Sequence, residues 1–201
     1  MSMRTPWALR AMHLAAHRDG EPAGGEHRPK ADTAPGDAGA RPVRTIGEGG
    51  RSVEAIRAAL AAVPGEFARL VNDKTDDQLM QPAQDGGFGM VEILPHMRDW
   101  EAILGNRVER ILDEDEPSLE EYDDSLWAIE HAYREQDPRQ ALQEFTALRA
   151  SLVARLETLR PEEWNRVGIL AKHGRVTLHW LLDQFSNHDA KHVVQARDVL
   201  A

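Results

Sequence analysis

Apolar residues recur at helical spacing through most of the chain from residue 52 onward, and they form four stripes. The first helix is predicted over residues 53–73, the third from Pro138 and the fourth after Thr177. The second is predicted over about residues 90–113, with the stripe Met90, Ile93, Leu94, Met97, Trp100, Leu104, Val108 and Ile111. No stretch alternates apolar and polar residues over a length typical of a strand. Four long amphipathic helices predict an all-α fold, a four-helix bundle.

Capping and helix-breaking residues refine these predictions. Ser52 and Thr177 can accept hydrogen bonds from the first free N–H groups of the helices that follow them. Pro138 suits the first turn of the third helix, where its missing N–H costs nothing. Pro64, which precedes a glycine, is expected to kink or split the first helix, and Pro95 is expected to bend the second.

The connection lengths predict how the helices are ordered in space. Helices one and two, and helices three and four, are joined by about 15 residues each, whereas about 24 residues join helices two and three. This long connection includes an expected short helix near residues 125–133. A crossover of that length can return the chain along the bundle, so helices two and three are expected to be parallel, with helices two and four antiparallel.

The first 50 residues differ in composition from the rest. They hold 8 of the 15 glycines and 5 of the 11 prolines, and residues 19–50 contain almost no large apolar side chain. Such a segment buries too little surface to offset the entropy of ordering. The sequence therefore predicts a disordered tail over residues 1–50 and one folded domain over residues 51–201.

Composition excludes several classes of chemistry. The chain has no cysteine, which excludes disulfides, thiolate ligands and a cysteine nucleophile and fits a reducing cytoplasm. A net charge of -10 argues against nucleic acid as the main partner, because phosphate contacts require a basic surface. The apolar runs are too short to span a membrane. We therefore expect a cytoplasmic protein that acts on a small molecule.

Three histidines are candidates for a metal site. His188 and His192 are one helical turn apart on the apolar face of the fourth helix, so both imidazoles can reach one ion. His96 flanks the apolar stripe of the second helix, about 9 Å from its start, and the histidine pair is about 12–18 Å from the end of the fourth. In an antiparallel helix pair these heights nearly match. The alternative is a hydrogen-bonded pair of core histidines. His13 and His17 share the spacing of the pair but are in the predicted tail.

Carboxylates near these histidines are candidates for supporting roles. Asp99 and Asp189 can accept hydrogen bonds from the ligand N–H groups or carry protons, and the alternative is that they are ordinary surface carboxylates. Gln195, almost one turn beyond His192, is a further candidate for the same role. The remaining histidines of the folded part are expected to face solvent: His131, His173 and His179.

Three segments carry a resemblance to a known family. They are GGFGMVEILPHMRDWE, FTALRASLVARLETLRPEEW and GRVTLHWLLDQFSNHDAKHVVQ. In these segments the chain resembles the DinB-like bundle proteins, from about Ser52 to Ala201. The paired histidines followed by Gln195 match the final helix of the family, and His96 matches its second-helix ligand. Phe88 stands where the family usually has tryptophan, and Pro95 is a further departure.

The resemblance implies more about structure than about reaction. It implies an up-down-down-up bundle, often a homodimer, with zinc or nickel held by His96, His188 and His192. Relatives include transferases that attach mycothiol, bacillithiol or glutathione to electrophiles, and a thiol-dependent maleylpyruvate isomerase. Many members have no known activity.

Three functions are consistent with such a site. Three neutral imidazoles leave a divalent ion its full charge and an open position, which is the layout of catalytic sites. The sequence and the resemblance favour a metal-dependent transferase, whose thiol must come from a low-molecular-weight cosubstrate because the chain has no cysteine. A metal-dependent hydrolase and a non-catalytic bundle stabilised by its metal are the alternatives.

Overall fold

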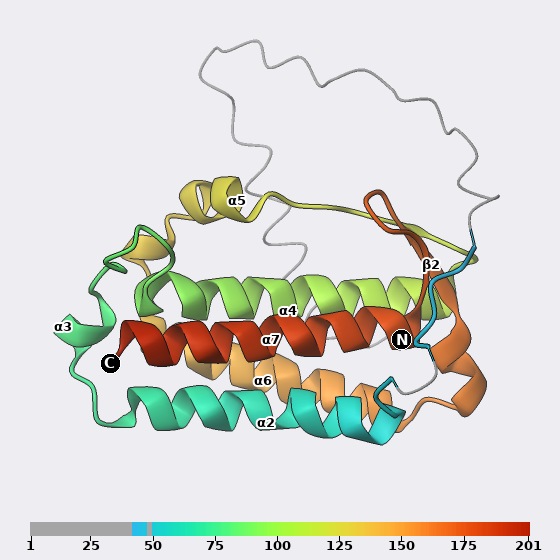
Figure 1. Ribbon diagram of the computed structural model, residues 1–201, viewed down its shortest axis with the longest axis horizontal. Helices are drawn as coiled ribbons and strands as arrows, with labels where there is room; N and C mark the ends of the chain where they lie inside the picture. Colours follow the sequence, from blue (N-terminus) through green and yellow to red (C-terminus); the bar gives the residue numbers. More distant parts are fainter. Residues whose placement is uncertain (1–41, 48–49) are drawn as a thin grey trace, which may run out of the picture.

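The computed structural model describes residues 42–47 and 50–201, and within them four long helices dominate (Figure 1). The elements, in chain order, are α2 (Val53–Asn72), α3 (Asp76–Leu79), α4 (Met90–Asp113), β1 (Ser118–Leu119), α5 (Asp124–Glu130), η3 (Tyr133–Glu135), α6 (Pro138–Glu157), η4 (Pro161–Asn165), β2 (Val167–Leu170), β3 (Gly174–Thr177) and α7 (Leu178–Val199). The second predicted helix, over residues 90–113, has the same bounds as α4.

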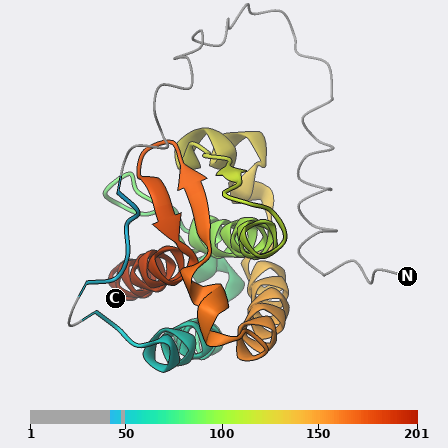
Figure 2. The same cartoon turned by 90° about the vertical axis from the view of Figure 1, so that its right-hand side faces the viewer.

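The four long helices form an up-down-down-up bundle, as predicted. The colour gradient in Figure 1 shows that α2 and α7 run in one direction while α4 and α6 run in the other. The connection from α4 to α6 returns along the whole bundle and carries β1 and α5 on its way. Figure 2 looks along the bundle and shows the helices around a common centre, with the β2–β3 hairpin at the near end.

The helix starts follow the predicted capping chemistry. The Ser52 hydroxyl accepts a hydrogen bond from the Ala55 N–H at 3.2 Å, and Thr177 Oγ1 accepts one from the Trp180 N–H at 3.1 Å. The predicted split at Pro64 does not occur, because α2 continues through this proline as one helix of 20 residues. Packing of α2 against its neighbours therefore outweighs the local cost of the proline.

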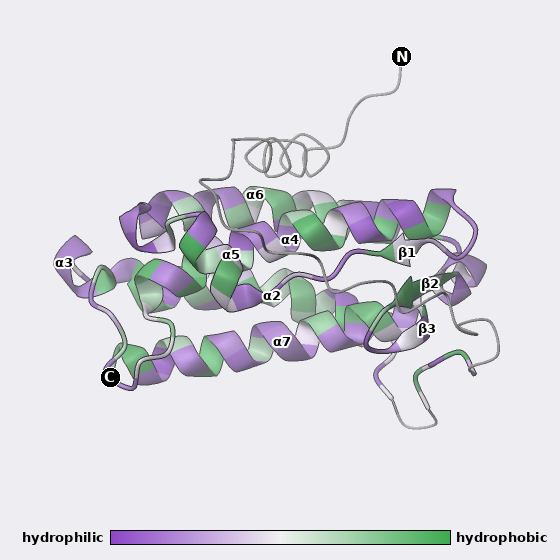
Figure 3. Cartoon of the chain, turned by 90° about the horizontal axis from the view of Figure 1, so that it is seen from above, coloured by the Kyte–Doolittle hydropathy of each residue, from purple (hydrophilic) through white to green (hydrophobic). Residues whose placement is uncertain are grey.

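Two apolar clusters fill the bundle, one toward each end. The cluster next to the β-hairpin includes Leu60, Leu104, Val108, Leu152 and Leu182. The cluster at the other end includes Phe67, Ile93, Met97, Phe145 and Val193. Each of the four long helices carries both hydrophobic and hydrophilic residues, as an amphipathic helix does (Figure 3). In the described part of the chain, no helix combines the length and the apolar character that a membrane crossing requires.

A small sheet closes one end of the bundle and corrects the expectation of no strands. β1 pairs with β2 in parallel, and β2 pairs with β3 in antiparallel register, with Val167 opposite Thr177. The strands are two to four residues long, too short to show a period of two in the sequence. Gly174, at φ +74°, follows the turn of the hairpin, where a left-handed conformation favours glycine.

The folded part begins slightly before the predicted boundary at residue 51. The Arg44 N–H donates to the Arg175 carbonyl at 2.8 Å, and the Thr177 N–H donates to the Arg44 carbonyl at 3.0 Å. Ile46 packs against the apolar cluster beside the hairpin. The prediction of disorder for residues 1–41 lies outside the described residues, as do His13 and His17.

Candidate metal centre

The structure brings the three predicted ligands together between α4 and α7. The His188 Nε2 atom lies 3.2 Å from the Nε2 of His96 and 3.1 Å from the Nε2 of His192. One nitrogen from each ring lies within 4.8 Å of the others. α4 and α7 run antiparallel, as predicted (Figure 1), and the contact between His96 and His188 shows that His96 lies at the height of the pair.

These separations fit nitrogen ligands of a single ion. Two imidazole nitrogens that each bond a zinc ion at 2.0–2.1 Å with tetrahedral angles are about 3.3 Å apart. The two Nε2–Nε2 distances of 3.1 and 3.2 Å are close to that value. The donor set therefore fits a divalent metal ion.

The hydrogen bonds on the outer side of the rings determine which nitrogen of His192 carries a proton. The Gln195 Nε2 group donates to the Phe88 carbonyl at 3.2 Å, which turns the Gln195 oxygen toward His192. That oxygen lies 2.9 Å from His192 Nδ1, so Nδ1 is the donor and carries the proton. The lone pair of the neutral ring is therefore on Nε2, the atom that faces the other two histidines.

His188 has a similar outer contact. Its Nδ1 atom lies 3.4 Å from Oδ1 of Asp189, a carboxylate that can only accept a hydrogen bond when ionised. The lone pair of His188 is then also on the Nε2 atom that faces the cluster. Two lone pairs directed at each other across 3.1 Å repel, and a shared cation removes this repulsion.

Burial keeps two of the rings in the neutral form that binds metals. Loss of hydration, followed by the proximity of His192 and His188, lowers the pKa of His96 to about 2. Loss of hydration and the neighbouring His188 lower the pKa of His192 to about 4, although its hydrogen bond to Gln195 acts in the opposite direction. Neither ring has to lose a proton before it binds an ion at neutral pH.

An aromatic shell surrounds the cluster. The Phe88 ring is edge-on to His96 at 5.5 Å, and the Trp100 ring lies 6.2 Å from His96 and 6.1 Å from His188. Phe88, which replaces the usual tryptophan of the resembled family, thus packs on one predicted ligand while its carbonyl holds Gln195. These contacts hold the imidazole rings in position.

Asp189 connects the candidate site to a buried charge network. Its Oδ2 atom accepts a hydrogen bond from Arg149 at 2.7 Å, and Arg149 donates to both oxygens of Glu101 at 2.8 and 2.6 Å. A further bond from Arg149 to the Leu60 carbonyl, at 2.7 Å, adds α2, so one guanidinium ties all four helices together. Burial opposes ionisation of Asp189, but Arg149 and the contact with His188 outweigh it and hold the pKa of this carboxyl below its ordinary value.

Asp99 lies in a second buried network beside the candidate site. Its carboxylate accepts hydrogen bonds from Arg98 Nε at 2.8 Å, the Tyr133 hydroxyl at 3.0 Å and Trp127 Nε1 at 3.3 Å. Asp99 is fully buried, so it is not a surface carboxylate. These bonds anchor α5 and η3 to α4, and the role of Asp99 toward the metal ligands stays a prediction.

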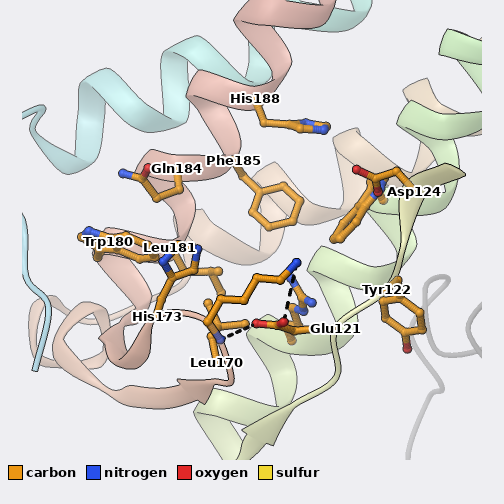
Figure 4. A pocket seen from close by; sticks show the side chains of 13 residues that line it. Glu121, Tyr122, Asp124, Leu170, His173, Trp180, Leu181, Gln184, Phe185 and His188 are labelled. Carbon is orange, nitrogen blue, oxygen red and sulfur yellow. Dashed lines mark hydrogen bonds and ion pairs between the residues drawn. The ribbon is translucent and has the colours of Figure 1, made fainter. Parts of the chain in front are cut away.

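A cavity of about 280 Å³ opens beside His188 (Figure 4). α7 contributes Trp180, Leu181, Gln184, Phe185 and His188 to its wall, and α4 contributes Trp100 and Arg107. The crossover contributes Glu121, Tyr122 and Asp124, and the hairpin contributes Leu170, Lys172 and His173. His188 is the member of the three-histidine cluster that lines the cavity, so a molecule bound there lies next to the candidate metal site.

Sequence reasoning placed the remaining histidines less well. His173 is exposed as predicted, but His179 is half-buried and its Nε2 atom lies 3.0 Å from the Arg51 carbonyl. His131 stacks on Trp127 with ring centroids 4.4 Å apart, and its Nε2 atom is buried without a hydrogen-bond partner among the described residues. The His179 contact joins segments 128 residues apart, which helical periodicity does not report, whereas Trp127 and His131 are about one turn apart at the end of α5.

The fold and the histidine cluster define a class: four-helix-bundle proteins with three histidines from two facing helices. The chain belongs to the DinB superfamily, whose family model matches residues 59–196. It is 28% identical over 107 residues to a Bacillus subtilis (strain 168) protein named "Putative metal-dependent hydrolase YfiT". That match covers 53% of this chain and 60% of the relative.

A solved structure of YfiT from Bacillus subtilis shows the same fold. The two structures superpose with a TM-score of 0.70 at 23% sequence identity, over 79% of this chain and 90% of the other. That structure is described as having an unusual four-helix bundle topology. The up-down-down-up order of α2, α4, α6 and α7 is consistent with this description.

Proposed function

We propose that this chain is a metal-dependent hydrolase that cleaves an ester or amide bond in a small molecule, with His96, His188 and His192 holding one divalent ion. The convergence of three Nε2 atoms beside an open cavity carries the proposal. The name of the YfiT relative, which calls it a metal-dependent hydrolase, supports it. In the reaction, the acyl carbon gains the hydroxyl of water while the leaving oxygen or nitrogen gains the proton.

The residues of the chain have distinct roles in this proposal. His96, His188 and His192 would hold the divalent ion, which would supply Lewis acidity near neutral pH. Gln195 and Asp189 fix the orientation of His192 and His188 through their Nδ1 atoms. Trp100 and Phe185 form apolar walls of the cavity beside His188, and they position the uncharged part of a substrate.

The size of the cavity favours hydrolysis over thiol transfer. Pockets that enclose drug-sized ligands have volumes of about 300–1,000 Å³, and this cavity is near the lower limit at about 280 Å³. One small substrate fits this volume, and water as the second reactant adds almost nothing to it. A transferase must hold a thiol cosubstrate as well as an electrophile. The absence of cysteine and the resemblance to thiol-dependent enzymes keep the transferase as the second candidate.

One assay separates the two reactions. The protein is loaded with zinc or nickel, the two ions that the family resemblance implies, and is given aryl esters and anilides with and without glutathione, mycothiol or bacillithiol. The hydrolase proposal expects turnover without thiol that requires metal and is lost in His192→Ala. His179→Ala, in the same helix but outside the cluster, is the matched control and keeps its activity.

The opposite pattern contradicts the proposal. Thiol adducts with monochlorobimane that depend on metal and on His192, with no thiol-independent turnover, assign the chain to the transferases. Metal binding without either activity assigns it to the non-catalytic bundles. A homodimer, which the family resemblance implies, and a cytoplasmic location, which the lack of cysteine suggests, are further proposals. Sedimentation of the purified protein tests the first.

A further inference from the structure

Arg107 is a buried cation in the wall of the cavity with few partners. Its side chain extends from α4, and the residue is only 6% exposed. One terminal nitrogen donates to the Glu120 carbonyl, while Nε is buried and has no hydrogen-bond partner among the described residues. Loss of hydration lowers the pKa of this guanidinium, although nearby Tyr122, Glu121 and Glu120 act in the opposite direction. A buried guanidinium with unused donors is costly unless an anion completes it.

The acidic groups in the cavity wall have their own partners. Glu121 accepts a hydrogen bond from the Lys172 main-chain N–H at 2.8 Å, and the Lys172 ammonium lies 3.9 Å from its other oxygen (Figure 4). Asp124 accepts a hydrogen bond from Trp100 Nε1 at 2.8 Å. Within the described residues, no carboxylate forms an ion pair with Arg107 at 4.0 Å or less.

The position of Arg107 relative to the histidines follows from helix geometry. Trp100 and Arg107 are four and eleven residues after His96, and eleven residues are close to three whole turns. All three side chains therefore extend from one face of α4. The Trp100 ring lies 6.1 Å from the His188 ring and 5.3 Å from the guanidinium carbon of Arg107. The distance between His188 and the guanidinium cannot exceed the sum of these two values.

We infer that Arg107 binds a carboxylate or other oxyanion of the substrate, so that the reacting bond lies at the three-histidine cluster and an apolar segment lies along Trp100. This inference names the substrate class of the proposed hydrolase and rests on that function. The substrate is a small anionic ester or amide whose charged end and reacting bond are separated by the apolar segment that packs on Trp100. The planar guanidinium forms paired hydrogen bonds with such a group.

A pair of probes that differ only in charge tests this assignment. 3-Phenylpropionate and 3-phenylpropionamide are titrated into metal-loaded and chelator-treated protein by calorimetry at pH 7.5. Hydrogen bonds to charged groups predict that the acid binds about ten- to a hundredfold more tightly than the amide. Persistence of this preference in chelator-treated protein shows that the anion does not bind through the ion.

Three variants of the full chain identify the residue responsible. Arg107→Gln removes the preference for the acid, and Arg107→Lys, which keeps the charge, restores part of it. Arg110→Gln makes the same change in charge on the same helix, but Arg110 pairs with Glu114 outside the cavity. The Arg110→Gln variant should therefore prefer the acid over the amide as strongly as the wild type does. Helical content and metal content of each variant are measured beside the titrations.

Other outcomes overturn the inference. A wild-type protein that does not prefer the acid, or an Arg107→Gln variant that keeps the preference, makes Arg107 a structural anchor for the crossover. If Lys172→Gln weakens binding of the acid more than Arg107→Gln does, the anion site is at the hairpin and not at Arg107. These titrations do not measure turnover, so an Arg107-dependent preference without any hydrolysis refutes the proposed reaction and leaves the anion site standing.

Discussion

Replacement of Arg149 by methionine tests whether one buried charge holds the bundle and the candidate site together. The guanidinium contacts α2, α4 and α7 from α6, and its side chain is 2% exposed, with 1% for Glu101 and 2% for Asp189. Methionine fills much of the volume but leaves two carboxylates buried without a counter-charge. Breaking a buried ion pair from one side costs about 3–5 kcal/mol. A folded part of about 150 residues then melts roughly 10 °C lower.

The decrease in the free energy of unfolding that Arg149→Met causes also depends on pH. Without Arg149, burial and mutual repulsion raise the pKa values of Glu101 and Asp189 in the folded state above those in the unfolded state. Such groups add stability at low pH, and this contribution is lost as pH rises through the folded-state pKa values. The difference between Arg149→Met and the wild type is therefore larger at pH 8 than at pH 5.

Urea denaturation followed by circular dichroism, at both pH values and with chelator present, measures these differences. Arg155→Met is the matched control, because Arg155 is on the same helix and pairs with Glu109 where the two side chains are 31% and 21% exposed. An ion pair of that kind contributes about 1 kcal/mol or less. The assigned role of the buried network is refuted by equal decreases in the free energy of unfolding in the two arginine variants. It is also refuted if the decrease in Arg149→Met does not change with pH.

Three further predictions follow from the site and the start of the fold. Because the pKa values of His96 and His192 are lowered to about 2 and 4, the unfolded state takes up protons first as pH falls below 6.5. The free energy of unfolding of chelated protein, measured by urea denaturation, should therefore fall by about 1.4 kcal/mol per histidine and pH unit, and a flat profile between pH 7 and 5 refutes this. Gln195→Leu should weaken zinc affinity about 10–100-fold in competition titrations, since the tautomer of His192 is no longer fixed, whereas Gln184→Leu on the same helix should not. A chain that starts at residue 51 should melt lower than one that starts at residue 42, because it lacks the pairing beside β3, and equal melting temperatures contradict that contribution.

The helices and the histidine cluster could be predicted because both depend on periodicity. A 3.6-residue period sets the bounds and the buried face of α4, and it places His188 and His192 on the inner face of α7. Adding His96 required one topological step, the antiparallel run of α4 and α7. The structure confirms that step, and the rise per residue then brings the three rings to one height.

The features that sequence reasoning missed depend on contacts between distant segments. Arg149 follows the apolar stripe of α6, but its partners Glu101 and Asp189 are 48 and 40 residues away. The small sheet pairs strands too short to show a pattern, and the cavity is assembled from two helices, the crossover and the hairpin. Arg107 did leave a signal, since it shares a face of α4 with His96, but only the surrounding elements show that it is buried.

Metal content of single-histidine variants tests the central claim most directly. After reconstitution with zinc or nickel and dialysis, elemental analysis of the wild type should give close to one ion per chain. His96→Ala, His188→Ala and His192→Ala should each lose most of the bound ion, because each removes one of three converging nitrogens, while His179→Ala should retain it. Full occupancy in any of the three cluster variants, or an equal loss in His179→Ala, would contradict the assignment of this cluster as the metal site.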